Sequence, residues 1–286
     1  MKLASYQYQG EEHVGIVRDG AVCSVRSLGL PWRDLLTLIR HMTPEEVESL
    51  PCGAAADWIP LEQVTLRAPI PRPDQDVICL GLNYSEHIDE SARFEQRDIP
   101  VQSTYFSKRV NEAVADGAPI DSHADFVTAL DYETELAFVL AKDAYRVPAG
   151  EAERYVFGYT ILNDVSARDV QMSHGQWYFG KSLDSFTPMG PWLVTRSELA
   201  FPPSGRIETR VNGELRQSAD LRQMIFKIPF IIEELSRGMT LRAGTIISTG
   251  TPSGVGLGSV PPKYLTAGDV VECSIDGIGT LRNPVN

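Results

Sequence analysis

Two glutamates, Glu133 and Glu135, stand directly before an apolar run that ends at Leu140. In a β-strand, successive side chains point to opposite faces of the sheet. Glu133 and Glu135 would then share one face. Leu136, Phe138 and Leu140 would share the other face. The segment therefore predicts a strand that is buried within a sheet and carries two neighbouring carboxylates.

This pair of glutamates has two interpretations. Neighbouring carboxylates on a buried strand repel each other unless a cation lies between them, and oxygen ligands suit Mg²⁺, Mn²⁺ or Ca²⁺ better than zinc. Alternatively, the strand enters from solvent and both side chains are exposed, since glutamate is mainly a surface residue. The spacing by itself leaves both interpretations open.

A third carboxylate follows a second apolar segment, residues 157–163. Asp164 lies where this segment ends, which is a common place for a ligand. Alternatively, Asp164 opens a turn as an Asx or N-cap residue.

The rest of the chain after residue 76 is rich in short strand-like segments and has no regular alternation of strand and helix. Asn212-Gly213 predicts a hairpin tip, and residues 228–237 predict a helix that Gly238 ends as a C′ residue. A proline-rich seam, Pro69 to Pro73, precedes this part. We predict an α+β fold with a large mixed sheet, a small N-terminal α+β domain over residues 1–70 and a main domain over residues 71–286.

Composition excludes several classes of protein. The net charge of −12 disfavours nucleic acid and anionic membranes as partners. No apolar stretch is long enough to span a bilayer, and the polar start lacks the apolar core of a signal peptide, so we expect a cytoplasmic protein. The four cysteines form no Cys-x-x-Cys pair, which favours buried free thiols over a zinc or redox site.

His87 and Glu90 follow a buried-looking strand and are neighbours if the segment is helical. A carboxylate beside an imidazole fixes its tautomer and raises its basicity, as general base catalysis requires. Alternatively, His87 is a surface residue in a loop.

Two further segments are candidates for binding an anionic substrate. Residues 247–258 form a glycine-rich loop whose backbone N–H groups, with the Thr251 hydroxyl, suit a carboxylate; a simple tight turn is the alternative. Lys181 lies in an apolar, turn-rich stretch. It is either a buried cation that stabilises an enolate or a solvated loop residue. Arg168 and Gln171 are further candidate donors.

Taken together, these segments closely resemble the fumarylacetoacetate hydrolase family over about residues 72–284. The motifs that carry the resemblance are, in chain order, Asn83-Tyr84-x-x-His87-x-x-Glu90, Phe106-x-Lys108, Glu133-x-Glu135, Asn163-Asp164-x-x-x-Arg168-Asp169-x-Gln171, Gly180-Lys181 and Ser248-Thr249-Gly250-Thr251-Pro252-x-Gly254-Val255-Gly256.

The resemblance implies a mixed β-roll and a homodimer. It implies Mg²⁺ or Mn²⁺ as the metal, with Ca²⁺ as a substitute in crystals. The implied metal ligands are Glu133, Glu135 and Asp164. The implied catalytic residues are His87, Glu90 and Lys181. The implied substrate contacts are Tyr84, Arg168, Gln171, Gly250 and Thr251.

The expected function is hydrolysis of a carbon–carbon bond in an acylpyruvate or other 2,4-dioxo acid through a metal-bound enolate. The alternatives that share this site are an oxaloacetate-type 2-oxo acid decarboxylase and an isomerase or hydratase of aromatic-degradation intermediates. A noncatalytic metal- or ligand-binding β-domain is the alternative from another class. We expect the N-terminal unit and residues 91–104 to shape the distal part of the pocket.

Overall fold

The computed structural model describes residues 1–53, 56–91 and 102–286. The strands of the first 70 residues are β1 Lys2–Tyr8, β2 Glu11–Arg18, β3 Ala21–Ser24, β4 Trp58–Pro60 and β5 Thr65–Leu66. The later strands are β6 Val77–Gly81, β7 Thr104–Lys108, β8 Leu130–Asp131, β9 Thr134–Leu140, β10 Val156–Asn163, β11 Ser166–Ala167, β12 Met189–Thr195, β13 Arg206–Val211, β14 Glu214–Asp220, β15 Ile246–Ser248, β16 Val270–Ile275 and β17 Gly279–Pro284.

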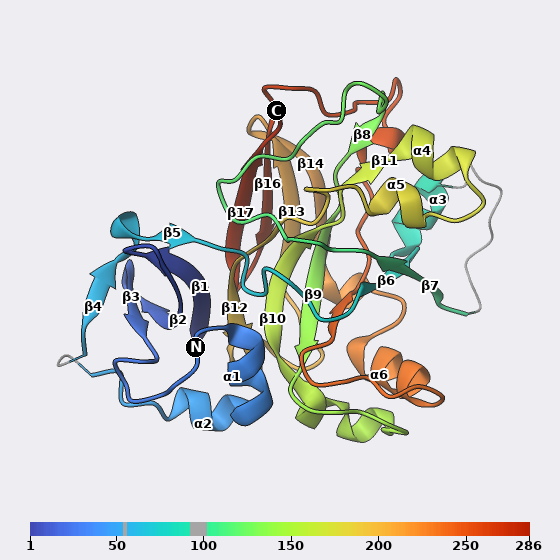
Figure 1. Ribbon diagram of the computed structural model, residues 1–286. Helices are drawn as coiled ribbons and strands as arrows, with labels where there is room; N and C mark the ends of the chain where they lie inside the picture. Colours follow the sequence, from blue (N-terminus) through green and yellow to red (C-terminus); the bar gives the residue numbers. More distant parts are fainter. Residues whose placement is uncertain (54–55, 92–101) are drawn as a thin grey trace.

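Helices are few and short by comparison, as Figure 1 shows. They are α1 Leu35–His41, α2 Pro44–Glu48, α3 Ser85–Ser91, α4 Arg168–Ser173, α5 Tyr178–Lys181 and α6 Ile228–Ser236. The 3-10 turns are η1 Leu61–Gln63, η2 Ala149–Tyr155, η3 Arg196–Glu198, η4 Leu221–Gln223 and η5 Gly256–Gly258. The predicted α+β class is confirmed. Within the described residues, no helix is both long enough and apolar enough to cross a membrane.

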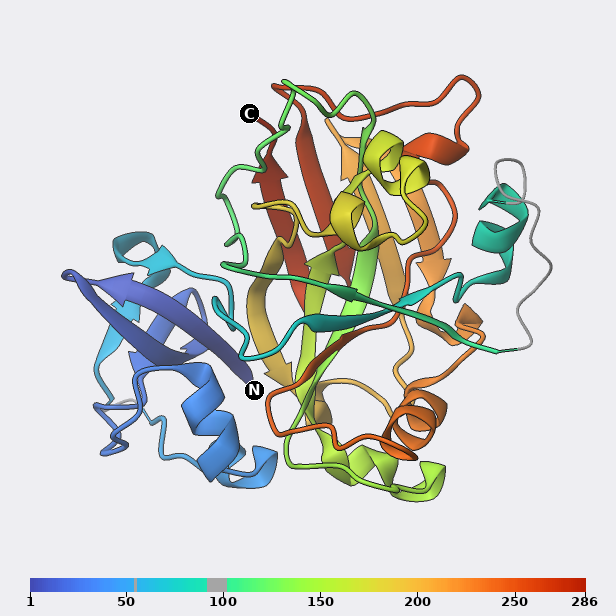
Figure 2. The ribbon, with the colours of Figure 1, turned by 45° about the vertical axis from the view of Figure 1, so that its right-hand side comes forward.

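One large sheet runs through the molecule in the order β4-β3-β2-β1-β12-β10-β9-β15-β6-β7, with β5 added to β1. The β15–β6 pair is parallel and the other pairs are antiparallel, so the sheet is mixed as predicted. A second sheet, in the order β14-β13-β16-β17, packs against β9 and β10 (Figure 2). Phe138 and Ile161 of the first sheet share a core with Ile207 and Leu281 of the second.

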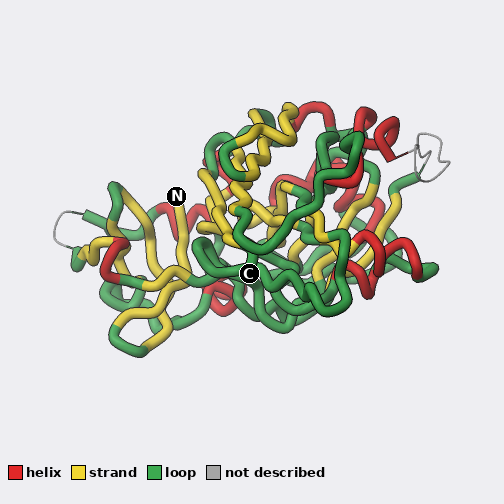
Figure 3. The backbone as a smooth tube through the Cα atoms, turned by 90° about the horizontal axis from the view of Figure 1, so that it is seen from above, coloured by secondary structure: helices red, strands yellow, loops and turns green. Residues whose placement is uncertain are grey.

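The N-terminal unit is joined to the rest by this sheet. β1 pairs with β12, with Leu3 opposite Leu193, and both residues lie in one apolar cluster with Phe157. Seen from above, the unit lies at one side of the molecule (Figure 3). The parts of the chain on either side of the predicted boundary at residue 70 share one sheet and one apolar cluster, and the boundary stays a prediction.

The alternation predicted for the carboxylate-bearing strand is present in β9. Leu136 and Phe138 pack into the core between the two sheets, whereas Ala137 and Val139 pack into the cluster on the other face. The strand begins at Thr134, one residue later than predicted. Glu133 lies in the link between β8 and β9. Both faces of β9 are buried, which explains why its apolar run is continuous.

Two helix ends are set by the residues that flank them. The helix α1 begins at Leu35, because the side chain of Asp34 accepts the N–H of Thr37 and caps it. The helix α6 ends at Ser236, and Gly238 follows without the positive φ that a C′ glycine usually adopts. Since Arg237 is the C-cap of α6, Gly238 holds the predicted C′ position, but without the left-handed backbone usual there.

Candidate active site

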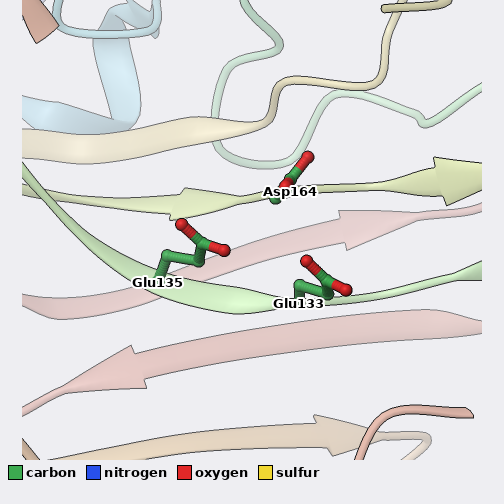
Figure 4. Close-up of side chains that lie close together, drawn as sticks. All are labelled: Glu133, Glu135 and Asp164. Atoms are coloured by element: carbon green, nitrogen blue, oxygen red, sulfur yellow. The ribbon is translucent and has the colours of Figure 1, made fainter. Parts of the chain in front are cut away.

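Three carboxylates meet where β9 and β10 lie side by side. Glu135 stands opposite Leu162 in this antiparallel pair, and Asp164 follows the last residue of β10. Carboxylate oxygens of Glu133, Glu135 and Asp164 lie within 4.8 Å of one another (Figure 4). Glu133 is 5% exposed and Glu135 is 1% exposed, so the interpretation of the pair as surface glutamates is wrong.

Backbone hydrogen bonds hold this corner. The N–H of Asp164 donates to the carbonyl of Glu133 over 2.8 Å, and the side chain of Asn163 accepts the N–H of Glu133 over 3.0 Å. The two chain segments are thus fixed to each other at the point where the carboxylates converge.

Buried cations compensate two of the three carboxylates. Lys181 Nζ donates to Glu133 Oε2 over 2.7 Å and to Asp164 Oδ2 over 2.8 Å. Lys108 Nζ lies 2.5 Å from Asp164 Oδ1, and Arg168 Nη2 lies 2.6 Å from Glu133 Oε1. Lys181 is 2% exposed, so the alternative of a solvated loop lysine is wrong. Burial by itself would raise the pKa of Glu133, but Lys181 and Arg168 outweigh it and hold that pKa well below its usual range.

Glu135 is the carboxylate that lacks such compensation among the described residues. It accepts hydrogen bonds from the Ser248 hydroxyl over 2.5 Å and from the Gly250 N–H over 3.0 Å, and both donors are neutral. Burial and the neighbouring charges of Asp164 and Glu133 raise the pKa of Glu135 well above its usual value. The site is therefore short of positive charge at Glu135.

A divalent cation fits this shortage. The cluster holds four buried carboxylates and three buried cations, namely Asp131, Glu133, Glu135 and Asp164 with Lys108, Arg168 and Lys181. Buried charges are stable only when they are paired or bind a metal. A divalent cation together with one substrate carboxylate would balance the remaining charge, and three carboxylates are a ligand set that suits Mg²⁺ or Mn²⁺.

His87 and Glu90 form a pair on α3, as predicted. His87 Nδ1 lies 3.2 Å from Glu90 Oε2, and His87 is buried against the cavity. An ionised carboxylate can only accept, so Nδ1 carries the proton in this pair and Nε2 is left to exchange one. The Gly254 N–H donates to both Glu90 oxygens over 3.1 and 3.2 Å, which ties the pair to the glycine-rich loop.

The glycine-rich loop contacts the carboxylate cluster as well as the cavity. The Gly250 N–H is used by Glu135. The Thr251 hydroxyl donates to the Thr134 carbonyl over 3.0 Å and accepts from Gln217 Nε2 over 2.8 Å. Thr251 lines the cavity. Substrate contacts at Gly250 and Thr251 stay predictions, and both groups already have partners within the protein.

The other predicted substrate contacts differ in position. Arg168 and Gln171 line the cavity, with Arg168 Nη1 donating to Gln171 Oε1 over 3.1 Å. Tyr84 is buried, and its hydroxyl has no hydrogen-bond partner within the described part of the chain. Since Tyr84 does not line the cavity, the structure gives no support to its expected substrate contact.

The cavity has a volume of about 70 Å³ and combines these charged groups with an apolar wall. The wall residues are Leu80, Leu82, Phe106, Met172, Trp177, Val255 and Leu257. Trp177 packs on Gly81, where an added Cβ would lie 2.5 Å from its ring, and Phe106 meets Trp177 edge to face. Of the described lining residues none comes from the N-terminal unit, so the expectation that this unit shapes the distal part of the pocket has no support from this cavity and stays a prediction. Most of the other expected segment, residues 92–101, lies outside the described residues.

Three residues of the site were not singled out from the sequence. Lys108 stood in a quoted motif without an assigned role. Asp131 shares the strand parity of Glu133 and Glu135, which was a usable signal for a third carboxylate on that face. No sequence signal marks Trp177 as part of the wall, because its partners Gly81 and Phe106 are far away in the chain.

Comparison with known proteins gives consistent findings. A family model described as fumarylacetoacetate (FAA) hydrolase C-terminal matches residues 76–286. The chain is 49% identical over 225 residues to oxaloacetate tautomerase YisK of Bacillus subtilis, which covers 79% of this chain and 74% of the relative.

Solved structures agree over the whole chain. A fumarylacetoacetate hydrolase from Exiguobacterium antarcticum superposes with a TM-score of 0.87 at 39% identity, covering 100% of this chain and 99% of the other. A maleylpyruvate hydrolase from Sphingobium sp. SYK-6, in complex with manganese(II) and pyruvate, has a TM-score of 0.78 at 28% identity, covering 100% and 98%.

Proposed function

Because this chain belongs to the fumarylacetoacetate hydrolase family, we propose that it is a divalent-metal-dependent enzyme that moves a proton beside the keto group of a small 2-oxo acid. The reaction we assign is keto–enol tautomerisation of oxaloacetate or a close analogue. The observation that carries this is a single cavity lined by His87, Lys181, Glu133 and Glu135. Its other support is the 49% identity to an oxaloacetate tautomerase.

The three carboxylates would hold Mg²⁺ or Mn²⁺. When bound, the cation supplies Lewis acidity that polarises the 2-oxo group and makes the neighbouring C–H more acidic. Lys181 adds a fixed positive charge at the same corner, since its Nζ is held by Glu133 and Asp164. Such a preorganised charge stabilises an enolate oxygen more strongly than water would, because it needs no reorientation.

His87 is the group we assign to the proton transfer. Glu90 holds the Nδ1 proton, so Nε2 can take a proton from the carbon beside the keto group and return it to the oxygen or the carbon. The apolar wall around Trp177 and Phe106 limits the access of bulk water, which preserves the enolate for reprotonation.

Carbon–carbon bond hydrolysis of an acylpyruvate is the second candidate. The same pair favours it, because an imidazole that removes a proton from carbon can also remove one from a water molecule. Its support is the likeness to a maleylpyruvate hydrolase. Decarboxylation of oxaloacetate uses the same enolate and needs no attacking water.

A substrate panel separates these reactions. Purified protein with Mn²⁺ would be given enol-oxaloacetate, an acylpyruvate and a hydroxymuconate-type acid, with products followed by ultraviolet absorbance and NMR. We expect ketonisation of enol-oxaloacetate far above the rate with Mn²⁺ alone, with the carbon skeleton intact. If enol-oxaloacetate decays at the buffer rate while an acylpyruvate is cleaved, the tautomerase assignment is replaced by the hydrolase.

A further inference from the structure

Asp131 has no direct role in the proposed chemistry, but its hydrogen bonds connect two parts of the site. Its side chain is fully buried in β8, two residues before Glu133. Oδ2 accepts from Arg168 Nε over 2.8 Å and from the Leu257 N–H over 3.0 Å. Oδ1 accepts from the Gly256 N–H over 2.7 Å and from the Tyr132 N–H over 2.9 Å. Four donors on one carboxylate fix its position and its orientation.

Through Arg168, Asp131 is connected to the proposed metal ligands. The guanidinium of Arg168 is planar, so holding its Nε also sets the direction of Nη2. Nη2 donates to Glu133 Oε1 over 2.6 Å. Asp131 therefore orients the group that holds one carboxylate of the cation site.

Through the glycine-rich loop, Asp131 is also connected to the His87–Glu90 pair. Asp131 holds Gly256, and the Tyr132 hydroxyl donates to the Gly254 carbonyl over 3.0 Å. The N–H of Gly254 in turn binds Glu90. The packing at these two glycines is tight. An added Cβ at Gly256 would lie 2.6 Å from Asp131 Oδ1, and one at Gly258 would lie 1.8 Å from Glu90 Oε1.

We propose that Asp131 is a positioning residue that couples the cation site to the His87–Glu90 pair. A change in the position of Arg168 at Glu133 reaches the amides of the loop through one rigid carboxylate. Occupation of the cation site and ordering of the Gly254 amide against Glu90 then favour each other, and this coupling is reciprocal. The metal side of the inference rests on the proposed function, whereas the loop side does not.

Asp131→Asn tests this directly. Asparagine has nearly the same shape, but its amide nitrogen places a donor against Arg168 Nε and the Leu257 N–H, or against the N–H groups of Gly256 and Tyr132. We expect the Kd for Mn²⁺, measured by calorimetry, to rise about 10-fold, in the range seen when a group that supports a metal ligand is lost. In the metal-free protein, hydrogen exchange at the amides of Gly254, Gly256 and Leu257 should speed up about 10-fold or more, and the slowing that Mn²⁺ causes there in the wild type should be lost.

Asp169→Asn is the matched control. Asp169 follows Arg168 on α4 but accepts from the N–H and hydroxyl of Thr128, away from the loop. It should keep the wild-type Kd for Mn²⁺ and the wild-type exchange rates in the loop. Urea unfolding of both variants distinguishes a local effect from a general loss of stability.

Two results with Asp131→Asn would overturn the proposal. One is a wild-type Kd together with wild-type exchange in the loop. The other is faster exchange spread evenly over the whole chain, which indicates only a structural role. If this variant does not fold, Arg168→Lys decides. It should raise the Kd and remove the slowing of loop exchange that Mn²⁺ causes in the wild type, and a wild-type Kd or a wild-type slowing would refute the coupling.

These measurements need no substrate, so an error in the assigned reaction does not affect them. If the wild-type protein binds no Mn²⁺, the proposed cation site fails, and the metal-free exchange experiment still tests whether Asp131 holds the loop.

Discussion

Lys181 donates to Asp164 Oδ2 over 2.8 Å, and of these two buried residues Asp164 is 0% exposed and Lys181 is 2% exposed. The pair is held from the other side by Lys108, whose Nζ lies 2.5 Å from Asp164 Oδ1. Burial tends to lower the pKa of Lys181, but Asp164 and Glu133 outweigh it and raise that pKa. In the metal-free protein these two carboxylates therefore favour the charged form of Lys181, which is suited to stabilising negative charge.

Replacing Lys181 by methionine should abolish most turnover and spare metal binding. Loss of one preorganised charge at an enolate costs about 10²- to 10³-fold in kcat. The Kd for Mn²⁺ should stay the same or fall, since a like charge has been removed. Breaking the buried pairs should also destabilise the metal-free protein by about 3–5 kcal/mol.

Turnover and Mn²⁺ calorimetry on this variant provide the check. Lys142→Met, at an exposed lysine over the Tyr155 ring, serves as the control and should behave as the wild type. Wild-type kcat in Lys181→Met would remove Lys181 from the mechanism.

Glu135→Gln should lose Mn²⁺ binding without harming the metal-free fold. Glu135 has no cationic partner among the described residues and its ionised form is disfavoured, so a neutral side chain of the same shape fits as well. Calorimetry should show a Kd for Mn²⁺ at least about 100-fold higher. At a metal concentration 100 times its Kd, the wild type should gain about 2.7 kcal/mol of stability, which is seen as a thermal shift. This thermal shift should disappear in the variant.

Glu272→Gln, on the half-buried β16, is the control for this change and should keep the thermal shift. A Glu135→Gln protein that binds Mn²⁺ as the wild type does would show that this carboxylate is no ligand.

Removing the imidazole should separate binding from proton transfer. In His87→Asn, the cation site remains complete because His87 lies on α3 and donates to none of the three carboxylates in the described structure. We expect an unchanged Kd for Mn²⁺ and a kcat reduced about 10²- to 10⁴-fold, the usual contribution of a general base. Steady-state kinetics on enol-oxaloacetate gives the answer, and a normal kcat would exclude the pair from the reaction.

The thiols should be inert in the folded protein. All four cysteines are free and buried, as predicted. Burial raises the pKa of Cys273 to about 12, and it raises the pKa of Cys79 well above its ordinary value. The thiolate is the reactive form, so at pH 8 only roughly one Cys273 thiol in ten thousand is ionised, and reactivity rises only as the pH approaches that pKa.

Ellman's reagent at pH 8 should therefore label no thiol quickly in the native state and four in guanidinium. Rapid release of one equivalent from the folded protein would contradict this account of the core.

The three proposed metal ligands could be found from the sequence because their signal is local. Period-two spacing put Glu133 and Glu135 on one face, and the end of an apolar segment marked Asp164. The pairing of β9 with β10 then brought them together. The order of several motifs along the chain was specific enough to identify the family and its mixed sheet.

The sequence did not show which hydrogen-bond or ion-pair partner each polar group has in the folded protein. From the sequence, the Gly250 N–H was a candidate donor to a substrate carboxylate. In the structure it donates to Glu135. Asp131 and Lys108 act through contacts with Arg168 and Asp164, which lie 37 and 56 residues away in the chain. Such long-range choices depend on the assembled sheet, as does the pairing of β1 with β12 that joins the N-terminal unit to the rest.

The most direct test of the central claim is metal dependence with one purified preparation. The protein would be treated exhaustively with EDTA, and its activity on enol-oxaloacetate and on an acylpyruvate measured before and after adding Mg²⁺ or Mn²⁺, with Glu135→Gln in parallel. We predict that chelation abolishes the activity, that either cation restores it in the wild type, and that neither restores it in the variant. Activity that survives chelation and does not respond to either cation would contradict the assignment of Glu133, Glu135 and Asp164 as the ligands of a catalytic metal.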